Sequence, residues 1–360
     1  MNIQILAVLL VIQSFIACQP APDDIRVSAA SIGFQSADSS KQDSERSLLP
    51  AANIVYQSVD NGQTWQDVSA GLPGDVQPES IFTGANEIFL GTQNGLYRSS
   101  NTSTTPIWRQ SLFLYGRITA IFPGRTGLYA CSYDHGLFHN ITGTDIWMPL
   151  TNTLKDKTVR TVVETADGAL FVGCDSGIFK STDNGQTWKQ VFEEGIVLNI
   201  VEMGGVLIGG SVNGVLRSTD GGEHWDYALN ENILAKKTGL IGNQFVTILG
   251  TTDATKLIPE GVTHRLRASD DGGKTWHRLE RALFPVQGAY DMDERLSQVK
   301  DLYDIIQAGE YLFCSFDAGI FRSSDQGKTW EPVFPTNGQV SFNFAVSGEV
   351  IYAVQKSAGC

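Results

Sequence analysis

The sequence predicts an all-β protein, a seven-bladed β-propeller in which four-stranded antiparallel blades surround a central axis. The first observation is a motif, Ser-x-Asp-x-Gly-x-Thr-Trp, that recurs along most of the 360 residues. The second is that short apolar runs flank each copy, as two strands flank a hairpin turn. The third is the spacing of the copies, roughly 40 residues, which is the period of a four-stranded blade and not of a helical solenoid.

The recurring motif has the chemistry of a turn that satisfies its own hydrogen bonds. Its Ser and Asp side chains can bond nearby backbone N–H groups, and its Gly supplies a left-handed backbone conformation. The closing Trp is large and apolar, so we expect it to lie between neighbouring sheets with its indole N–H bonded to one partner. We therefore predict a structural role for the Asp and Trp of the five well-preserved copies, which are Asp60, Trp65, Asp183, Trp188, Asp220, Trp225, Asp271, Trp276, Asp325 and Trp330.

All 7 tryptophans of the chain occupy this closing position if Trp108 and Trp147 end two degenerate copies. The residues at 97–100 and 137–140 match the strand that precedes the turn in the other copies, but the Asp and the Gly of the turn are missing. The repeat therefore extends over two blades whose turn has changed.

The motif resembles the Asp-box, or BNR repeat, of sialidases, sortilin-type receptor domains, xyloglucan-cleaving propellers and photosystem II assembly factors of the Ycf48 type. The resemblance covers about residues 51–360. In all of these families the box is a structural turn, which implies that Ser181, Asp183 and Trp188 belong to the scaffold and not to a chemical site.

The two ends of the repeat region predict one shared blade. Residues 53–59 and 64–68 resemble the third and fourth strands of a blade, and residues 340–346 and 349–354 match the first two. Joining them hides the two strand edges that an open ring would leave exposed. The count is then seven, with the intact blades at about 76–110, 111–150, 158–192, 196–229, 232–280 and 298–334.

Residues 1–17 are predicted to be a signal peptide, because the apolar run at 3–12 is too short for a bilayer-spanning helix. The run ends in Ala17-Cys18, which resembles a bacterial lipobox and implies lipidation of Cys18. Gln19 resembles the outer-membrane sorting preference. Residues 18–50, rich in Ser, Asp, Gln and Pro, follow as a disordered tether. We expect an exported outer-membrane lipoprotein of a bacterium, and a secreted protein with an ordinary signal is the alternative.

The net charge of −13 argues against nucleic acid as a partner and against electrostatic adhesion to an anionic membrane. Membrane contact is therefore expected only through the lipid anchor. The cysteine spacing predicts no metal site, and we expect no cofactor and a monomer. Cys131 and Cys314 align at second-strand positions and are predicted to be buried free thiols, whereas Cys174 is predicted to sit in a turn.

Alternating strand directions predict which face of the ring carries a ligand site. The boxes are turns between strands 3 and 4, so the turns between strands 2 and 3 and the connections from strand 4 to strand 1 share the opposite face, where propeller channels open to ligands. The insertions at 254–263 and 281–296 fall on that face, and long loops in compact repeats are commonly functional. The candidate binding residues on this rim are Arg117, Asp134, His135, Arg160, Asp175, Tyr290, Asp291, Arg295 and Asp317.

The residues give little support to an enzyme. A sialidase-like site implies an arginine trio, a Tyr–Glu pair and a Phe/Tyr-Arg-Ile-Pro motif, whereas the stretch at 116–119, Gly-Arg-Ile-Thr, lacks the proline. A xyloglucan-cleaving relative implies two carboxylates across a cleft between two propellers, and one propeller is predicted here. We therefore predict a module that binds a protein or a glycan, or assists assembly. The alternative is a glycoside hydrolase that uses Asp134, Asp175 or Asp317.

Overall fold

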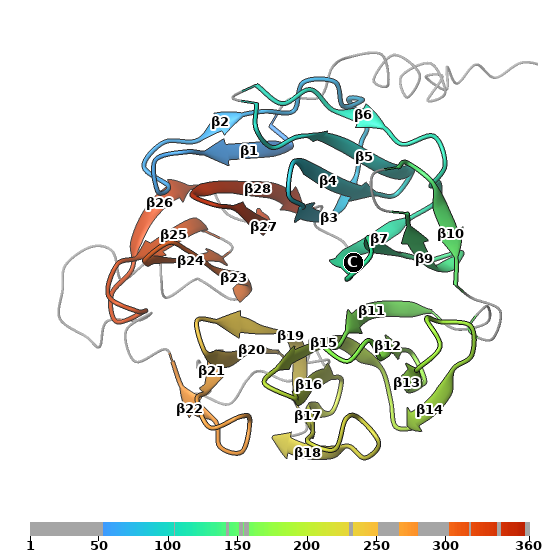
Figure 1. Cartoon of the computed structure of the whole chain (residues 1–360). Coiled ribbons are helices and arrows are strands. Elements are labelled where there is room, and N and C mark those ends of the chain that lie inside the picture. The colour runs from blue at the N-terminus through green and yellow to red at the C-terminus, as the bar shows by residue number, and fades with distance from the viewer. Residues whose placement is uncertain are drawn as a thin grey trace, which may run out of the picture. The chain divides into compact units, whose positions relative to one another are not determined.

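The computed structural model shows seven four-stranded antiparallel sheets arranged in a ring, which confirms the predicted β-propeller (Figure 1). It describes residues 53–103, 105–141, 144–150, 154, 158–229, 233–250, 266–279, 302–316, 318–336 and 340–356. By its contacts the chain divides into residues 1–42 and 43–360, and every described residue belongs to the second unit. Over these described ranges no helix is long and apolar enough to cross a membrane.

Six blades each consist of four consecutive strands, with the first strand innermost (Figure 1). The strands of the first three are β3 (Pro78–Thr83), β4 (Glu87–Thr92), β5 (Gly95–Ser100) and β6 (Arg109–Gln110); β7 (Ile118–Pro123), β8 (Leu128–Ser132), β9 (Gly136–Asn140) and β10 (Trp147–Pro149); and β11 (Val159–Glu164), β12 (Leu170–Cys174), β13 (Gly177–Ser181) and β14 (Lys189–Phe192). The strands of the next three are β15 (Val197–Met203), β16 (Val206–Ser211), β17 (Gly214–Ser218) and β18 (Asp226–Leu229); β19 (Leu234–Ile241), β20 (Gln244–Gly250), β21 (Leu266–Ser269) and β22 (His277–Arg278); and β23 (Leu302–Ala308), β24 (Tyr311–Phe316), β25 (Gly319–Ser323) and β26 (Glu331–Pro335).

The seventh blade is assembled from both ends of the repeat region, which confirms the predicted closure. Its strands, from the centre outwards, are β27 (Ser341–Ser347), β28 (Val350–Lys356), β1 (Val55–Ser58) and β2 (Gln66–Asp67). In Figure 1 the blue β1 lies beside the red β28, and the two pair antiparallel with Val55 opposite Val354. Gln57 also donates a hydrogen bond to the Tyr352 hydroxyl at 3.1 Å. Contacts between innermost strands continue around the ring, with β27 touching both β23 and β3.

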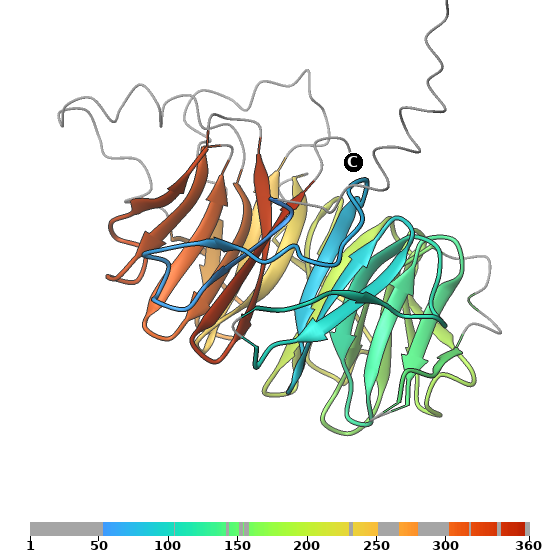
Figure 2. The same ribbon diagram turned by 90° about the horizontal axis from the view of Figure 1, so that it is seen from above.

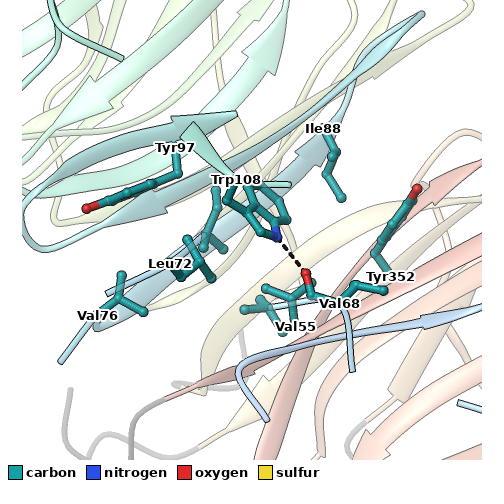
Figure 3. Close-up of a cluster of buried hydrophobic side chains, with 10 residues drawn as sticks. Val55, Val68, Leu72, Val76, Ile88, Tyr97, Trp108 and Tyr352 are labelled. Carbon is teal, nitrogen blue, oxygen red and sulfur yellow. Dashed lines mark hydrogen bonds between the residues drawn. The ribbon is translucent and has the colours of Figure 1, made fainter. Parts of the chain in front are cut away.

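The apolar core lies between the blades. In the described residues, buried side chains form seven clusters, and each has one of the seven tryptophans in it or packed against it, as the prediction of an intersheet position requires. Around Trp225, for example, Phe171 of one blade meets Leu207 of the next, and the Phe171 and Trp225 rings lie edge to face with centroids 6.3 Å apart. Figure 3 shows the cluster around Trp108. Burying one such large side chain contributes about 1.5–3 kcal/mol.

The Asp-box turns close on themselves as predicted. In the copy at 181–188, the Gly185 N–H donates to the Ser181 hydroxyl at 2.9 Å and that hydroxyl donates to Asp183 at 2.7 Å. The other Asp183 oxygen accepts the Thr187 hydroxyl at 2.6 Å. The Trp188 indole N–H then donates to the Gly185 carbonyl at 3.1 Å, so the turn itself orients the ring that enters the core.

The described cysteines are buried free thiols, which confirms the prediction for Cys131 and Cys314. Burial raises the pKa of both thiols, so they stay protonated at neutral pH. The prediction for Cys174 is wrong, because this residue ends β12 and is not in a turn. Cys174 pairs with Gly177 of β13, and the hairpin turn is therefore confined to the two residues between them.

The box glycines offer a matched test of core packing. Gly221 and Gly222 both have positive φ, of 70° and 79°, but a Cβ on Gly222 would lie 2.1 Å from the Phe171 ring, whereas a Cβ on Gly221 would meet nothing within 4 Å. We expect Gly221→Ala to cost about 1–2 kcal/mol of left-handed strain. Gly222→Ala should cost about 1–3 kcal/mol more, because the buried Phe171 must move. Chemical denaturation of the two variants measures the difference, and equal losses would contradict this packing.

Candidate functional site

The candidate site lies on the face opposite the Asp-boxes, at the starts of the first strands and the turns between second and third strands. Figure 2 shows the ring from its side, with the strands running between the two faces. The connection of residues 111–117, here called the rim loop, belongs to the candidate face. It leads from β6, the outermost strand of one blade, to β7, the innermost strand of the next.

The rim loop is held by its middle and by its first residue. Leu114 is buried in the cluster around Trp147, and the Ser111 N–H donates to the Leu96 carbonyl at 2.8 Å. Between and beyond these anchors the loop turns apolar side chains outwards, and Tyr115 is 70% exposed. The loop therefore presents an aromatic ring on a fixed backbone.

Arg117, at the inner end of the rim loop, is fixed by two interactions. Its Nε and Nη2 donate to the two carboxylate oxygens of Glu79 at 2.9 and 3.3 Å. Its guanidinium also lies 5.2 Å from the centroid of the Tyr133 ring. A bidentate arginine–carboxylate pair restricts orientation more strongly than a single bond, and a cation over an aromatic face adds about 0.5–1 kcal/mol at an exposed site.

His135 brings the turn between β8 and β9 against the rim loop. The His135 and Tyr115 rings lie edge to face with centroids 5.3 Å apart. Gly116, with a φ of 83°, permits this approach, because a Cβ there would lie 3.1 Å from His135 and 3.5 Å from Asp134. The predicted residues Arg117, Asp134 and His135 thus gather with two tyrosines in one group, here called the rim cluster: Tyr115, Arg117, Tyr133, Asp134 and His135.

Two further predicted residues pair with each other on the next blade. The Arg160 Nε donates to the Asp175 carboxylate across the start of β11 and the β12–β13 turn. This ion pair is partly exposed. The remaining predicted residues, Tyr290, Asp291, Arg295 and Asp317, lie outside the described residues, as do both insertions.

Three members of this face were not predicted from the sequence. Glu79 enters from the preceding blade, 38 residues from the arginine that it binds. Tyr115 lies two residues before Arg117, and Tyr133 lies next to Asp134. This closeness in sequence to predicted binding residues is the signal that could have identified the two tyrosines. Among the residues that the structure describes, no three His, Cys, Asp or Glu side chains gather as a metal ion requires.

The Asp-box face carries carboxylates that are already committed to turns. Hydrogen bonds from the Thr187 side chain and backbone lower the pKa of Asp183 to about 2, and Thr329 does the same for Asp325. At the copy that has His224, its Nδ1 lies 2.6 Å from Asp220 and lowers the pKa of that carboxyl. These carboxylates are engaged by hydrogen bonds within their own turns.

Family models match parts of three copies of the motif. The model described as BNR-Asp box repeat matches residues 320–333, and that described as BNR/Asp-box repeat matches 179–190 and 267–278. The chain carries BNR/Asp-box repeats. No curated protein is similar enough in sequence to match it.

Several solved structures share the fold of this chain. Ycf48 bound to a D1 peptide aligns at 15% identity and a TM-score of 0.54, over 78% of this chain and 93% of Ycf48. The GH74 xyloglucanase of Xanthomonas campestris aligns at 17% and 0.52, over 75% of this chain and 46% of that one. PorZ, a surface component of the type-IX secretion system of Porphyromonas gingivalis, aligns at 11% and 0.55, over 82% and 49%. The chain therefore spans about half the length of these last two, and the likeness shows the fold.

The lowered pKa values of the box aspartates predict an acid-sensitive fold. An unfolded aspartate takes up its proton near pKa 3.8, whereas folded Asp183 does so near 2. The stability contributed by such a carboxylate is complete above about pH 4 and is lost as the pH falls toward 2. We expect Asp183→Ala to lower the melting temperature at pH 7 and the difference from the unchanged chain to shrink between pH 4 and pH 2. Thermal unfolding across this range checks it, and a constant difference would contradict it.

Proposed function

We propose that this chain is an exported binding module that takes a protein or glycan partner on the face opposite the Asp-boxes. The rim cluster carries this proposal, because Tyr115 and Tyr133 are 70% and 48% exposed beside a fixed arginine. Exposed aromatic groups mark interaction sites, and tyrosine and arginine dominate the binding energy of many interfaces.

The fixed geometry of the rim cluster favours binding. Ordering one long side chain at an interface costs about 0.5–1.5 kcal/mol. Arg117 is already ordered by Glu79 and Tyr133, and Tyr115 is braced by His135. A partner therefore meets side chains that need little further ordering.

The similar solved structures support both classes of partner. One of them is Ycf48 with a bound peptide, and another is named as a xyloglucanase. The second name also supports the alternative proposal, a glycoside hydrolase that uses rim carboxylates. Two of the rim carboxylates named for this alternative are described by the structure. Asp175 forms an ion pair with Arg160, and Asp134 belongs to the rim cluster.

The place of action is proposed from the N-terminal sequence. A signal peptide at 1–17, lipidation of Cys18 and a polar tether up to residue 50 would hold the propeller near the outer membrane of a bacterium, and a secreted form is the alternative.

A test of the binding proposal uses the full mature chain on arrays of glycans, including xyloglucan oligosaccharides, and of synthetic peptides. We expect at least one class to bind, and a Tyr115→Ala, Arg117→Ala double variant to bind about tenfold or more weakly, because it removes both the aromatic anchor and the fixed charge. Lys189→Ala, an exposed change in another blade, is the control and should leave affinity unchanged. Folded protein that binds neither array, or binds equally well as the double variant, would contradict the proposal.

The same glycans distinguish a binding module from the alternative, a glycoside hydrolase. Release of reducing ends that disappears in Asp134→Asn or Asp175→Asn identifies a glycoside hydrolase, whereas binding without turnover supports the module.

The anchor has its own test. Cys18→Ser removes the thiol that lipidation requires, so we expect it to move the protein from the membrane fraction to the soluble fraction of the producing cells. Immunoblots of the two fractions measure the change. Retention in the membrane fraction would contradict the proposed anchor and would leave the binding proposal untouched.

A further inference from the structure

Exposed large apolar side chains concentrate on two adjacent blades. Of the ten such side chains in the described residues, eight lie between positions 107 and 148, in the blades β3–β6 and β7–β10. The other two are Val59 and Leu240. These same two blades carry the degenerate boxes that end in Trp108 and Trp147.

Two hydrogen bonds, one from the Ser111 side chain and one within the backbone, bring part of this apolar surface together. The Ser111 hydroxyl donates to Asp145 at 2.7 Å, which places the outer end of the rim loop against the turn before β10. Across that turn the Ile141 N–H donates to the Ile146 carbonyl at 3.1 Å. We call the resulting surface the flank patch, defined as Leu112, Phe113, Ile141, Ile146 and Met148, which are 82%, 60%, 41%, 50% and 52% exposed.

Strand alternation explains the outward apolar side chains of Met148, in β10, and of Ile146, the residue before it. Successive side chains of a strand point to opposite faces, so Ile146 and Met148 share one face and Trp147 takes the other. Trp147 is buried in the intersheet cluster, which turns Ile146 and Met148 away from the core. Their exposure is thus fixed by the fold.

An exposed arginine, Arg109, stands beside the flank patch. The whole chain has a net charge of −13, and in these two blades Arg117 is paired with Glu79. Arg109, on the edge strand β6, is exposed, and no carboxylate lies within 4.0 Å of it among the described residues. Arg98 lies 3.6 Å from Glu87 and 3.8 Å from Asp145, so its charge is already compensated and Arg109 is left to meet a partner. Complementary charge would steer an acidic partner to this flank.

We propose that the flank patch binds a polypeptide segment in which apolar side chains stand next to carboxylates. The flank patch is mainly aliphatic, with Leu112, Ile146 and Met148 beside a single aromatic ring, Phe113, and it accepts apolar anchors. An extended anionic membrane surface would face the net charge of the whole chain, −13, whereas a short peptide meets mainly the charges beside the patch. The patch is separate from the rim cluster, because it lies beside the outermost strands β6 and β10, whereas the rim cluster lies at the start of the innermost strand β7 and in the β8–β9 turn.

The experiment measures the affinity of the full mature chain for synthetic peptides of about twelve residues. Every peptide contains two or three Leu or Phe residues. The remaining residues are Glu and Asp in the acidic set, Lys in a second set and only Ser in a third. We expect the acidic set to bind about tenfold or more tightly than the Lys set, and added salt to weaken it, because the charges are at the surface. Arg109→Glu should remove the preference for acidic peptides.

Two matched sets of variants locate the binding. Leu112→Ser combined with Ile146→Ser should weaken binding of the acidic peptides about tenfold or more. Leu240→Ser, an exposed apolar side chain in a distant blade, should leave it unchanged. Tyr115→Ala with Arg117→Ala should also leave it unchanged, so that failure of the rim proposal and failure of this one are distinguishable. Leu112, Ile146, Leu240 and Tyr115 are exposed and Arg117 is partly buried, so thermal unfolding checks that each variant folds.

Four outcomes would overturn the proposal. The first is equal binding by the chain with and without the flank changes, and the second is a preference for the Lys peptides. The third is binding to vesicles of phosphatidylglycerol, but not to peptides, that the Leu112→Ser, Ile146→Ser variant loses. The fourth is a self-associated chain in sedimentation that becomes monomeric in this variant, because the flank patch would then be the contact between copies of the chain.

Discussion

The packing of one tryptophan between each pair of neighbouring blades is the contact on which the ring depends. Each of the seven clusters combines side chains of two sheets, so no blade buries both of its faces alone. The turn chemistry serves this packing: in the preserved box at 181–188 the polar groups bond one another, and the glycine carbonyl holds the indole N–H of Trp188. Closure by β1 and β28 then gives the last interface the same construction as the others, because Val55 and Tyr352 enter one cluster with Trp108.

The degenerate copies show how much of the box this packing requires. Trp108 lies in its intersheet cluster although its Asp and Gly are missing, and its indole N–H donates instead to the Val68 carbonyl of the neighbouring blade at 2.8 Å (Figure 3). Position in the core therefore does not depend on the turn that precedes the ring. Once that turn is released from its structural role, its exposed positions can carry other side chains. Ile107, Ile141 and Ile146 occupy such positions in the two degenerate copies.

How well the sequence predicts a feature depends on how far apart in the chain its interacting residues lie. The box is complete within eight residues, so its hydrogen bonds, its repeat and the number of blades were all readable from the motif and its spacing. The rim cluster was predicted in part, because Arg117, Asp134 and His135 carry polar side chains in turns whose face follows from strand alternation. Its partner Glu79 comes from another blade, and Tyr115 gains its place by packing on His135, so both depend on how the sheets meet. Cys174 was misplaced because pairing with Gly177 extends β12 beyond its apolar run.

The rim loop connects the two proposed binding surfaces on either side of its buried middle residue, Leu114. Leu114 is 1% exposed and packs beside Trp147, while its neighbours on either side, Phe113 and Tyr115, point outwards to the flank patch and the rim cluster. Because the loop leads from the outermost strand of one blade to the innermost strand of the next, one anchor supports side chains at both ends. Shortening Leu114 would loosen both surfaces together, whereas changes at Leu112 or Tyr115 act on one surface each. Variants at Leu112 and Tyr115 can therefore lose one binding activity each, although both surfaces are supported by the same loop.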